Sequence, residues 1–194
     1  MIKFFAMIAR MKYINRWSLM RNEHSENLCE HSFDVASTAH ALAVIGNRRF
    51  GKNYNAERCA LLGLYHDAPE TLTGDLPTPV KYYSEQVRAA YNTVEEYAAE
   101  SLISMLPDDI KEDYVPLLKK QADDKELWKI VKAADKISAL VKCVEEVKSG
   151  SAEFRTAAES TREAIRNMNM PEADFFLSEV LPAYELTLDE LKNR

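Results

Sequence analysis

The sequence predicts an all-α protein, and three observations carry that prediction. Only 5 of its 194 residues are glycine, whereas an antiparallel β fold needs many such permissive residues in its tight turns. Apolar residues recur at steps of three and four along most of the chain, which is the period of an amphipathic helix. We find no stretch whose apolar and polar residues alternate convincingly as in a half-buried strand.

The length is typical of one domain spanning residues 1–194, since domains commonly hold about 100–200 residues. A chain of this size buries about 70% of its unfolded surface, so it needs no disulfide or structural metal to hold its core. Hydrophobic residues make up 46% of the chain and charged residues 29%. These values exclude a disordered, collagen-like or low-complexity protein.

The formal net charge of −6 argues against a protein that binds a nucleic-acid polymer, because such binding relies on a basic surface. No window approaches the roughly 18 apolar residues of a membrane span, so we expect no membrane partner. The three cysteines are far apart, odd in number and form no C-x-x-C motif. This usage indicates reduced thiols and a cytoplasmic location, with Cys59 and Cys143 as packing residues.

The N-terminal segment is expected to form a helix packed on the body of the protein. Its predicted inner face consists of Ile2, Phe5, Ala9, Tyr13 and Ile14, which recur at helical spacing.

Two further helices are expected in the first half of the chain. Apolar positions predict one over about residues 27–45, and a loop follows over 46–54. Asn55 can cap the second helix, which runs to about residue 67. The first inner face contains Leu28, His31, Val35, Ala39 and Leu42, and the second contains Cys59, Leu62 and His66.

A loop is expected over TLTGDLPTPVKYY, because Pro77 and Pro79 break regular structure. The next helix ends before Pro107, and Pro116 is expected to split the segment after it. A helix through Leu127, Val131, Ala134, Ser138 and Val141 closes at residues 149–150, and two more follow over about 152–168 and 172–192.

The residues that carry chemistry are few. His31 and His66 lie on inward helical faces, where a lone histidine is ordinarily a core residue. His66 is followed by Asp67, and Asp135 lies within an apolar helix. A buried, unpaired aspartate is costly unless it is hydrogen-bonded or binds a cation. One interpretation satisfies all four groups, namely convergence on a single divalent ion with two nitrogen and two oxygen ligands.

A second metal is not expected. His40 follows His31 by nine residues and is therefore half a turn out of phase. His24 precedes the helix and is interpreted as an exposed or capping residue.

The order of these residues on a helical chain resembles the HD-domain phosphohydrolase superfamily. Longer motifs resemble the bacterial 5′-deoxynucleotidases of the YfbR type, over about residues 4–191. The matching motifs are NRW at 15–17, ENLCEHS at 26–32, YHDAPE at 65–70 and TGDLPTPVKY at 73–82.

The resemblance implies an HD-type helical bundle that hydrolyses 2′-deoxyribonucleoside 5′-monophosphates to deoxynucleoside and phosphate, as a homodimer. It implies one divalent ion such as Co, Mn or Zn, a catalytic carboxylate at Glu70 and a steric filter for the sugar at Trp17. The implied metal ligands are His31, His66, Asp67 and Asp135, and the implied substrate residues are Arg16, Trp17, Asp75, Leu76, Pro77 and Thr78.

One position departs from the family pattern, since Pro69 stands where serine is common. Proline there removes a backbone donor and is expected to disturb the helix just after the metal ligands.

Ordinary interpretations of the substrate residues stay open at this stage. Glu70 could be a solvated charge, Arg16 a surface residue, Trp17 a core anchor and Asp75 a turn former. Lys81 is a further candidate for steering phosphate, but nothing in the sequence fixes its direction.

Two other functions also stay open. The first is an HD phosphohydrolase acting on nucleoside triphosphates or cyclic nucleotides, although a triphosphatase needs several basic groups. The second is a non-catalytic metal-binding helical module, which has no need of a free carboxylate at Glu70.

Overall fold

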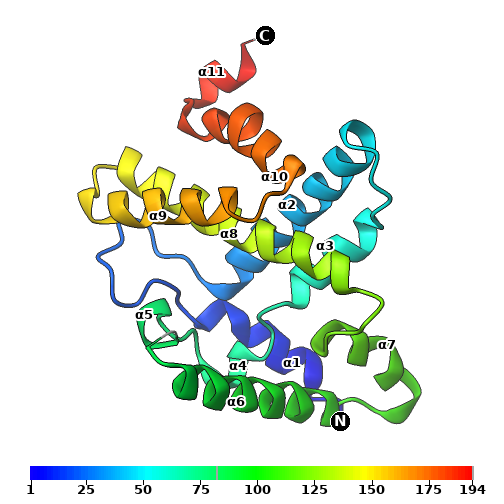
Figure 1. Cartoon of the computed structure of the whole chain (residues 1–194). Helices are drawn as coiled ribbons and strands as arrows, with labels where there is room; N and C mark the ends of the chain where they lie inside the picture. The colour runs from blue at the N-terminus through cyan, green and yellow to red at the C-terminus, as the bar shows by residue number, and fades with distance from the viewer. Residues whose placement is uncertain (82, 194) are drawn as a thin grey trace.

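The computed structural model describes residues 1–81 and 83–193. Within them the chain consists of helices joined by turns and loops, without a β-strand (Figure 1). An isolated antiparallel bridge pairs Asn15 with Asn27. The all-α prediction is confirmed. Among the described residues we find no helix whose length and hydropathy would suit a bilayer span.

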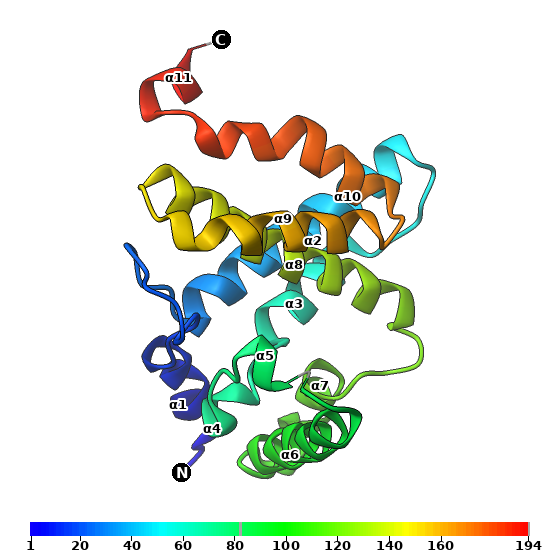
Figure 2. The same cartoon turned by 60° about the vertical axis from the view of Figure 1, so that its left-hand side comes forward.

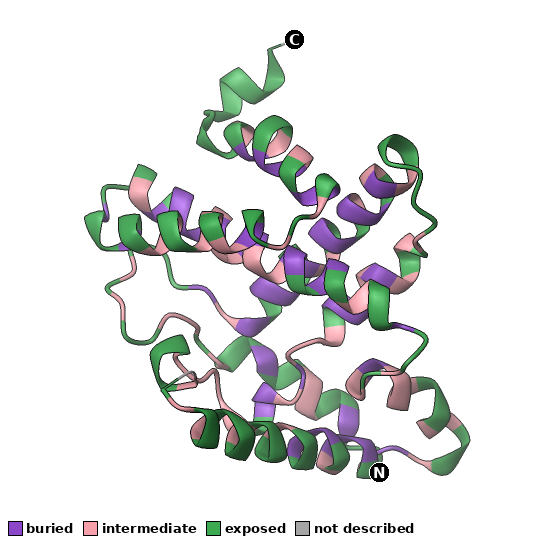
Figure 3. Cartoon of the chain, in the orientation of Figure 1, coloured by how far each residue is buried: buried purple, intermediate pink, exposed green. Residues whose placement is uncertain are grey.

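Three central helices form the middle of the molecule: α2 (Leu28–Arg49), α3 (Ala56–Tyr65) and α8 (Lys125–Lys148). In both Figure 1 and Figure 2 the C-terminal helices lie beyond one side of this group, and α1 and α4–α7 lie beyond the other. Buried residues concentrate on the central helices (Figure 3). The main core includes Val35, Leu42, Leu62, Ile130, Ile137 and Ile165.

Local sequence explains where α2 and α3 begin. The Asn27 side chain accepts from the N–H groups of Cys29 and Glu30. The Glu30 carboxylate in turn accepts from the N–H of Asn27, which completes a capping box. The Asn55 side chain accepts from the N–H of Arg58, so its predicted capping role is confirmed.

Gly63 lets α3 approach α2 closely. A Cβ at this position would lie 2.9 Å from the Cα of Ala36, so no larger residue fits without a shift of the backbone. This close approach brings the C-terminal end of α3, which His66 and Asp67 follow, near the start of α2, which carries His31.

The predicted face of the N-terminal segment is wrong. α1 (Phe4–Ile8) continues as a 3₁₀ helix, η1 (Ala9–Tyr13), and the buried side chains are Phe4 and Met11 while Ile2 and Phe5 are exposed. Ile2 precedes the helix, and from Ala9 onward the change from 3.6 to 3 residues per turn shifts the helical face. Phe4 forms a small second core with Ala68, Leu102 and Leu106.

The predicted boundaries of α2 and α3 also need correction. α2 continues through Gly46 to Arg49, and the Tyr54 ring packs against this glycine where a Cβ would collide with it. α3 ends at Tyr65, and residues 66–69 form a turn.

The expected proline-containing loop holds two short helices, α4 (Glu70–Thr73) and α5 (Thr78–Lys81). Pro79 is the second residue of α5, where a missing N–H removes no helical bond. Tyr82, the last residue of the matching motif, lies outside the described residues.

α6 (Glu85–Ser104) ends before Pro107 as predicted, but Pro116 does not split the next segment. It lies in the last turn of α7 (Asp108–Leu118), where its missing N–H removes one helical bond and the helix continues for only two more residues. Its carbonyl accepts from the Arg58 Nη2, at 3.2 Å.

The C-terminal third follows the predictions only partly. α8 closes where expected, and residues 152–166 form η2 (Ala152–Phe154) and α9 (Arg155–Arg166). The single helix predicted over 172–192 is wrong, because Pro182 cannot donate a helical hydrogen bond. The chain forms α10 (Pro171–Phe175), a π turn η3 (Phe176–Val180), a 3₁₀ turn η4 (Leu181–Glu185) and α11 (Leu188–Lys192).

Candidate metal centre and active site

The four expected ligands meet where α2, the end of α3 and α8 come together. His31 lies in the first turn of α2, His66 and Asp67 lie in the turn after α3, and Asp135 lies in the middle of α8. Oδ2 of Asp67 is 3.0 Å from Nε2 of His66 and 3.5 Å from Nε2 of His31. Oδ1 of Asp135 is 3.2 Å from Nε2 of His31. Packing therefore joins donors that are distant in sequence.

The other ring nitrogen of each histidine has its own partner. His66 Nδ1 donates to the carbonyl of Gly63 at 2.7 Å, and His31 Nδ1 is 3.1 Å from the hydroxyl of Ser138. The carbonyl requires a proton on Nδ1, so Nε2 of a neutral His66 presents its lone pair to the centre. Both Nε2 atoms are buried without a hydrogen-bond partner in the described part of the chain.

The charges in the group suit a cation. Burial alone would raise the pKa of Asp67, but His66, His31 and Arg16 hold that pKa well below its ordinary value. Burial alone would lower the pKa of His66, but contact with the Asp67 carboxylate raises it above the ordinary value. Asp67 is therefore an ionised oxygen donor beside two imidazoles.

Asp135 is less buried than its position in an apolar helix suggested. Its side chain is 40% exposed and contacts His31. Its neighbour Ala134, by contrast, is fully buried in the core.

These residues fit a divalent ion. Ligand distances of about 2.0–2.2 Å place neighbouring donors of an octahedral ion roughly 3 Å apart, close to the 3.0–3.5 Å between the donors here. Among the described residues, His31, His66 and Asp67 have ligand atoms that all lie within 4.8 Å of one another, and Asp135 joins this group through its contact with His31. Mixed imidazole and carboxylate donors suit Mn, Fe, Co, Ni or Zn.

Glu70 is the first residue of α4 and is 6% exposed, so it is not a solvated charge. Its Oε2 is buried without a hydrogen-bond partner among the described residues. Burial, together with the negative charges of Asp67 and Asp75, raises the pKa of Glu70 to about 9. This carboxyl group therefore holds a proton at neutral pH in the metal-free protein.

Pro69 causes less disturbance than expected. It is the N-cap of α4, with φ −57°, and α3 has already ended four residues earlier. A missing N–H at a helix start breaks no helical hydrogen bond.

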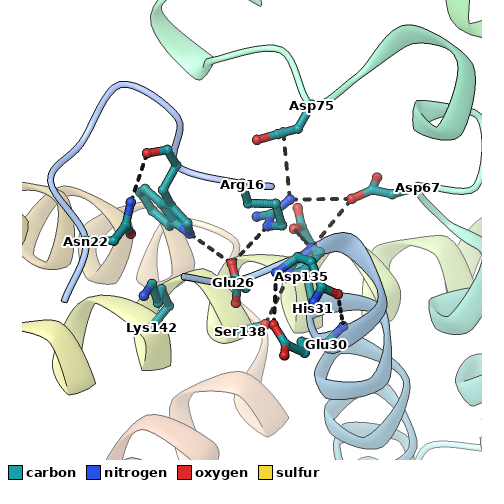
Figure 4. A network of polar contacts seen from close by, with 12 residues as sticks. Arg16, Asn22, Glu26, Glu30, His31, Asp67, Asp75, Asp135, Ser138 and Lys142 are labelled. Carbon is teal, nitrogen blue, oxygen red and sulfur yellow. Dashed lines mark hydrogen bonds and ion pairs between the residues drawn. The ribbon is translucent and has the colours of Figure 1, made fainter. Parts of the chain in front are cut away.

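Arg16 extends from the loop before α2 towards the ligand group (Figure 4). Its Nη1 lies 3.6 Å from Oδ2 of Asp67 and 3.9 Å from Oδ1 of Asp75, and its side chain is only 12% exposed. The surface interpretation of Arg16 is therefore wrong. The guanidinium lies between the ligand group and the loop that carries Asp75.

Trp17 has an unusual backbone, with φ 57° in the left-handed region. The side-chain amide of Asn22 donates to the carbonyls of Trp17 and Met20, at 3.2 and 2.9 Å, and holds this turn. The indole packs against Phe154 with ring centroids 5.4 Å apart. Trp17 reaches the ligand group only indirectly, through a residue that sequence reasoning missed.

That missed residue is Glu26. Its Oε2 accepts hydrogen bonds from Nε of Arg16 and from Nε1 of Trp17, both at 3.0 Å. The available signal was its place at the start of the ENLCEHS motif, but an acidic residue before a helix carries no specific meaning by itself.

The loop after α4 begins at Gly74, whose φ of 74° favours glycine. Only Asp75 of this loop reaches an ion-pair distance to the site, through Arg16. Lys81 bonds to Oε1 of Glu95 at 2.7 Å, so α6 fixes its direction. Leu76 and Pro77 are partly buried and Thr78 is exposed, and none of them contacts the ligands through a polar side-chain bond in the described chain.

His24 and His40 are exposed and lie outside the group, as expected. His40 faces solvent from α2, and the backbone of His24 contacts Glu146 and Lys142 of α8. The described residues thus supply a single centre with two histidines.

Comparison with known proteins places this arrangement in a family. Residues 3–184 match the family described as 5′-deoxynucleotidase YfbR-like. The chain belongs to the YfbR-like family. It is 48% identical over 188 residues to the 5′-deoxynucleotidase YfbR of Salmonella typhi, covering 97% of this chain and 94% of that protein. It is also 48% identical to the 5′-deoxynucleotidase VV1113 of Vibrio vulnificus, covering 97% of each chain.

Solved structures agree with the HD-type fold of this YfbR-like chain. An HD-domain phosphohydrolase from Listeria innocua matches with a TM-score of 0.78 and 27% identity, covering 94% of this chain and 88% of that one. The cyanophage S-2L HD phosphohydrolase DatZ, bound to dA and one catalytic Zn²⁺ ion, matches with a TM-score of 0.67. At 16% identity, with 91% and 95% of the two chains covered, this second match shows the fold alone.

Proposed function

We propose that this chain hydrolyses 2′-deoxyribonucleoside 5′-monophosphates to the deoxynucleoside and phosphate, with one bound divalent ion. The observation that carries the proposal is the grouping of His31, His66, Asp67 and Asp135 with the guanidinium of Arg16, beside the buried carboxyl group of Glu70. Membership of a family whose relatives are named 5′-deoxynucleotidases supports this substrate class.

The ion would be held by His31, His66, Asp67 and Asp135. When bound, it would supply a Lewis acid for a phosphate oxygen and lower the pKa of a water molecule. The donor set is compatible with Mn, Co or Zn, and which of them is bound depends on metal availability. Ser138 and the carbonyl of Gly63 orient the two imidazoles for this task.

Arg16 is placed to bind the phosphate. Its Nε is occupied by Glu26, and its terminal nitrogen Nη1 is directed towards Asp67 and Asp75. A guanidinium binds two oxygens of a phosphate at once. The described site holds a single arginine, and Lys81 is occupied by Glu95. This modest positive charge favours a monophosphate over a triphosphate.

Glu70 is placed to carry a proton. In the metal-free protein its raised pKa keeps a proton on the carboxyl group at neutral pH, and a proton held at this position can pass to the departing 5′-oxygen. In its ionised form the same group orients the attacking water. A buried carboxyl group without a hydrogen-bond partner is costly in a merely structural metal site.

Trp17 is the proposed filter for the sugar, with Leu76, Pro77 and Thr78 closing over the nucleotide and Asp75 contacting its sugar or phosphate. A purely apolar pocket rejects an added hydroxyl by only about 100-fold. A rigid indole does better, because a clash is added to the loss of fit. Its contacts with Glu26 and Phe154 supply that rigidity.

We further propose a cytoplasmic homodimer. The described cysteines are all free, which fits a reducing compartment. Light scattering of the purified protein tests the dimer.

The decisive experiment measures phosphate release after metal removal and reconstitution with Mn, Co, Zn or Mg. Deoxyribonucleoside and ribonucleoside monophosphates, a deoxynucleoside triphosphate and a cyclic nucleotide are compared. We expect metal-dependent release from the deoxyribonucleoside monophosphates above all others. Preference for a triphosphate or cyclic substrate would favour another HD phosphohydrolase, and metal binding without release a non-catalytic module.

A further inference from the structure

We propose that Glu26 is a positioning residue that sets the phosphate contact at Arg16 and the sugar filter at Trp17 together. The proposal rests on the proposed function of this site. It links two separate demands on the substrate, recognition of the phosphate and rejection of the 2′-hydroxyl, to a single carboxylate oxygen.

The geometry at Glu26 is specific. One atom, Oε2, accepts from the guanidinium of Arg16 and from the indole of Trp17, each at 3.0 Å (Figure 4). Successive side chains of an extended backbone point in opposite directions. The left-handed conformation of Trp17 breaks that alternation, and the side chains of two neighbouring residues reach the same oxygen. A strained backbone is retained where the surrounding structure requires it.

The base of the loop fixes Glu26 relative to its two donors. The N–H of Arg16 donates to the carbonyl of Glu26 at 2.9 Å, and the N–H of Leu28 donates to the carbonyl of Ile14 at 3.0 Å. Asn15 and Asn27 form the isolated bridge between these bonds. Glu26 therefore holds Arg16 through its backbone as well as through its side chain.

Helix α8 anchors the same loop from the other side. Oε2 and Oε1 of the buried Glu146 accept from the N–H groups of Glu23 and His24, at 2.8 and 3.0 Å. Lys142 donates to the carbonyl of His24 and to Glu146. Because α8 also carries Asp135, one helix supports both the loop and a proposed metal ligand.

Glu26 therefore couples the phosphate contact at Arg16 to the sugar filter at Trp17. With Glu26 in place, Nε of Arg16 is occupied and its Nη1 is directed towards Asp67, while the indole plane of Trp17 is fixed against Phe154. Without Glu26, both donors lose their common acceptor. A glutamate that only stabilised the loop would affect deoxyribonucleotide and ribonucleotide substrates equally.

The first test compares kcat/KM for dAMP and AMP in Glu26→Ala and Glu26→Gln. For Glu26→Ala we expect a loss of about 100-fold on dAMP, the scale of a misplaced substrate contact. The dAMP/AMP ratio should also fall about 10-fold, the scale of one hydrogen bond. Glu26→Gln keeps an acceptor oxygen, so its ratio should lie nearer the wild-type ratio.

Glu23→Ala is the matched control, because it removes an exposed carboxylate from the same loop and leaves the backbone bond to Glu146. It should behave like the wild type. In the double variant Trp17→Ala/Glu26→Ala the ratio should equal that of Trp17→Ala, since Glu26 acts on the sugar through the indole.

The second test does not depend on activity. The chain has two tryptophans, so an amide-correlated NMR spectrum shows two indole N–H signals, which Trp17→Phe assigns. We expect Glu26→Ala and Glu26→Gln to shift the Trp17 signal, and Glu26→Ala to speed its exchange with water, while the Trp128 signal stays unchanged.

An unchanged Trp17 signal in both variants would overturn the proposed contact. A dAMP/AMP ratio equal to that of the wild type in both variants would overturn the positioning role, even if overall activity fell. A wild-type protein without deoxynucleotidase activity would instead refute the proposed function, and the indole signals would still test the contact.

Discussion

Oδ1 of Asp135, in the middle of α8, lies 3.2 Å from Nε2 of His31, in the first turn of α2. The same imidazole nitrogen is 3.5 Å from Asp67, in the turn after α3. A single nitrogen on a buried ring thus faces carboxylates from two other parts of the chain.

Replacement of Asp135 tests the metal centre. Asp135→Ala removes one oxygen donor, and we expect loss of activity and a lower metal content with little change in helical content. The exposed Asp123→Ala is the control, because that residue lies outside the group. Circular dichroism, elemental analysis and phosphate release check the prediction. Full activity with unchanged metal stoichiometry would refute the proposed ligand set.

Replacement of Glu70 separates chemistry from binding. Glu70→Ala leaves the four donors in place, so the variant should still bind metal and deoxynucleotide. Turnover should fall by about 100-fold or more, the scale of a lost general acid–base group. Calorimetric titration and steady-state kinetics measure the two effects. Collapse of affinity with surviving turnover would make Glu70 a binding residue.

Replacement of Trp17 tests sugar selectivity. Trp17→Ala should raise the relative rate on ribonucleoside monophosphates, because the indole no longer blocks the 2′ position. Arg16→Ala should weaken both substrate classes alike, since both carry the same phosphate. The measurement is the ratio of kcat/KM for dAMP over AMP. If Trp17→Ala leaves this ratio unchanged, the indole is a core anchor and Asp75 is the next residue to test.

The raised pKa of Glu70 predicts a pH-dependent stability in the metal-free protein. Its ordinary value is 4.5 and its folded value is about 9. Below pH 4.5 both the folded and unfolded states hold the proton. Between these values only the folded state holds it, so the free energy of unfolding falls as pH rises. Glu70→Gln has no carboxyl proton, so its free energy of unfolding does not fall with pH for this reason. The free energy of unfolding of Glu70→Gln relative to that of the wild type should therefore grow from pH 4.5 to 9.

Urea unfolding across this range checks that prediction. The exposed Glu96→Gln serves as the control and should show no such trend. A stability difference between Glu70→Gln and the wild type that does not change with pH would contradict the protonated state of Glu70.

The cysteines predict a thiol count. Burial raises the pKa of Cys59 and Cys143 to about 12, so these thiols stay protonated and unreactive near neutral pH. Cys29 is exposed. An aromatic disulfide reagent should therefore titrate one thiol rapidly in the native protein and all three in denaturant. Rapid reaction in Cys29→Ser would show that a buried thiol is accessible.

The sequence was sufficient for features that depend on near neighbours along the chain. The capping residue Asn55, the inward faces of α2 and α3 and the end of α8 follow from helical spacing and side-chain capping. The proposed metal donors could also be recognised as residue types, because histidines on inward helical faces near aspartates are costly to bury without partners.

Only the tertiary structure decided how those residues meet. The distances among His31, Asp67 and Asp135 depend on the packing of three helices, and Gly63 permits the close approach of two of them. The exposure of Asp135 and the burial of Glu70 depend on which other segments of the chain cover each residue. These quantities depend on contacts between distant segments, which no local pattern encodes.

The loop that carries Arg16 and Trp17 shows the same difference between what the local sequence indicates and what tertiary packing determines. The NRW motif indicated that both residues are functional, but nothing in the sequence indicated a role for their common acceptor, Glu26. Its role depends on the left-handed backbone of Trp17 and on the bonds that close the loop. The role of Glu26 depends on where its hydrogen-bond partners lie. Those positions are set only when the loop is closed and held against α8.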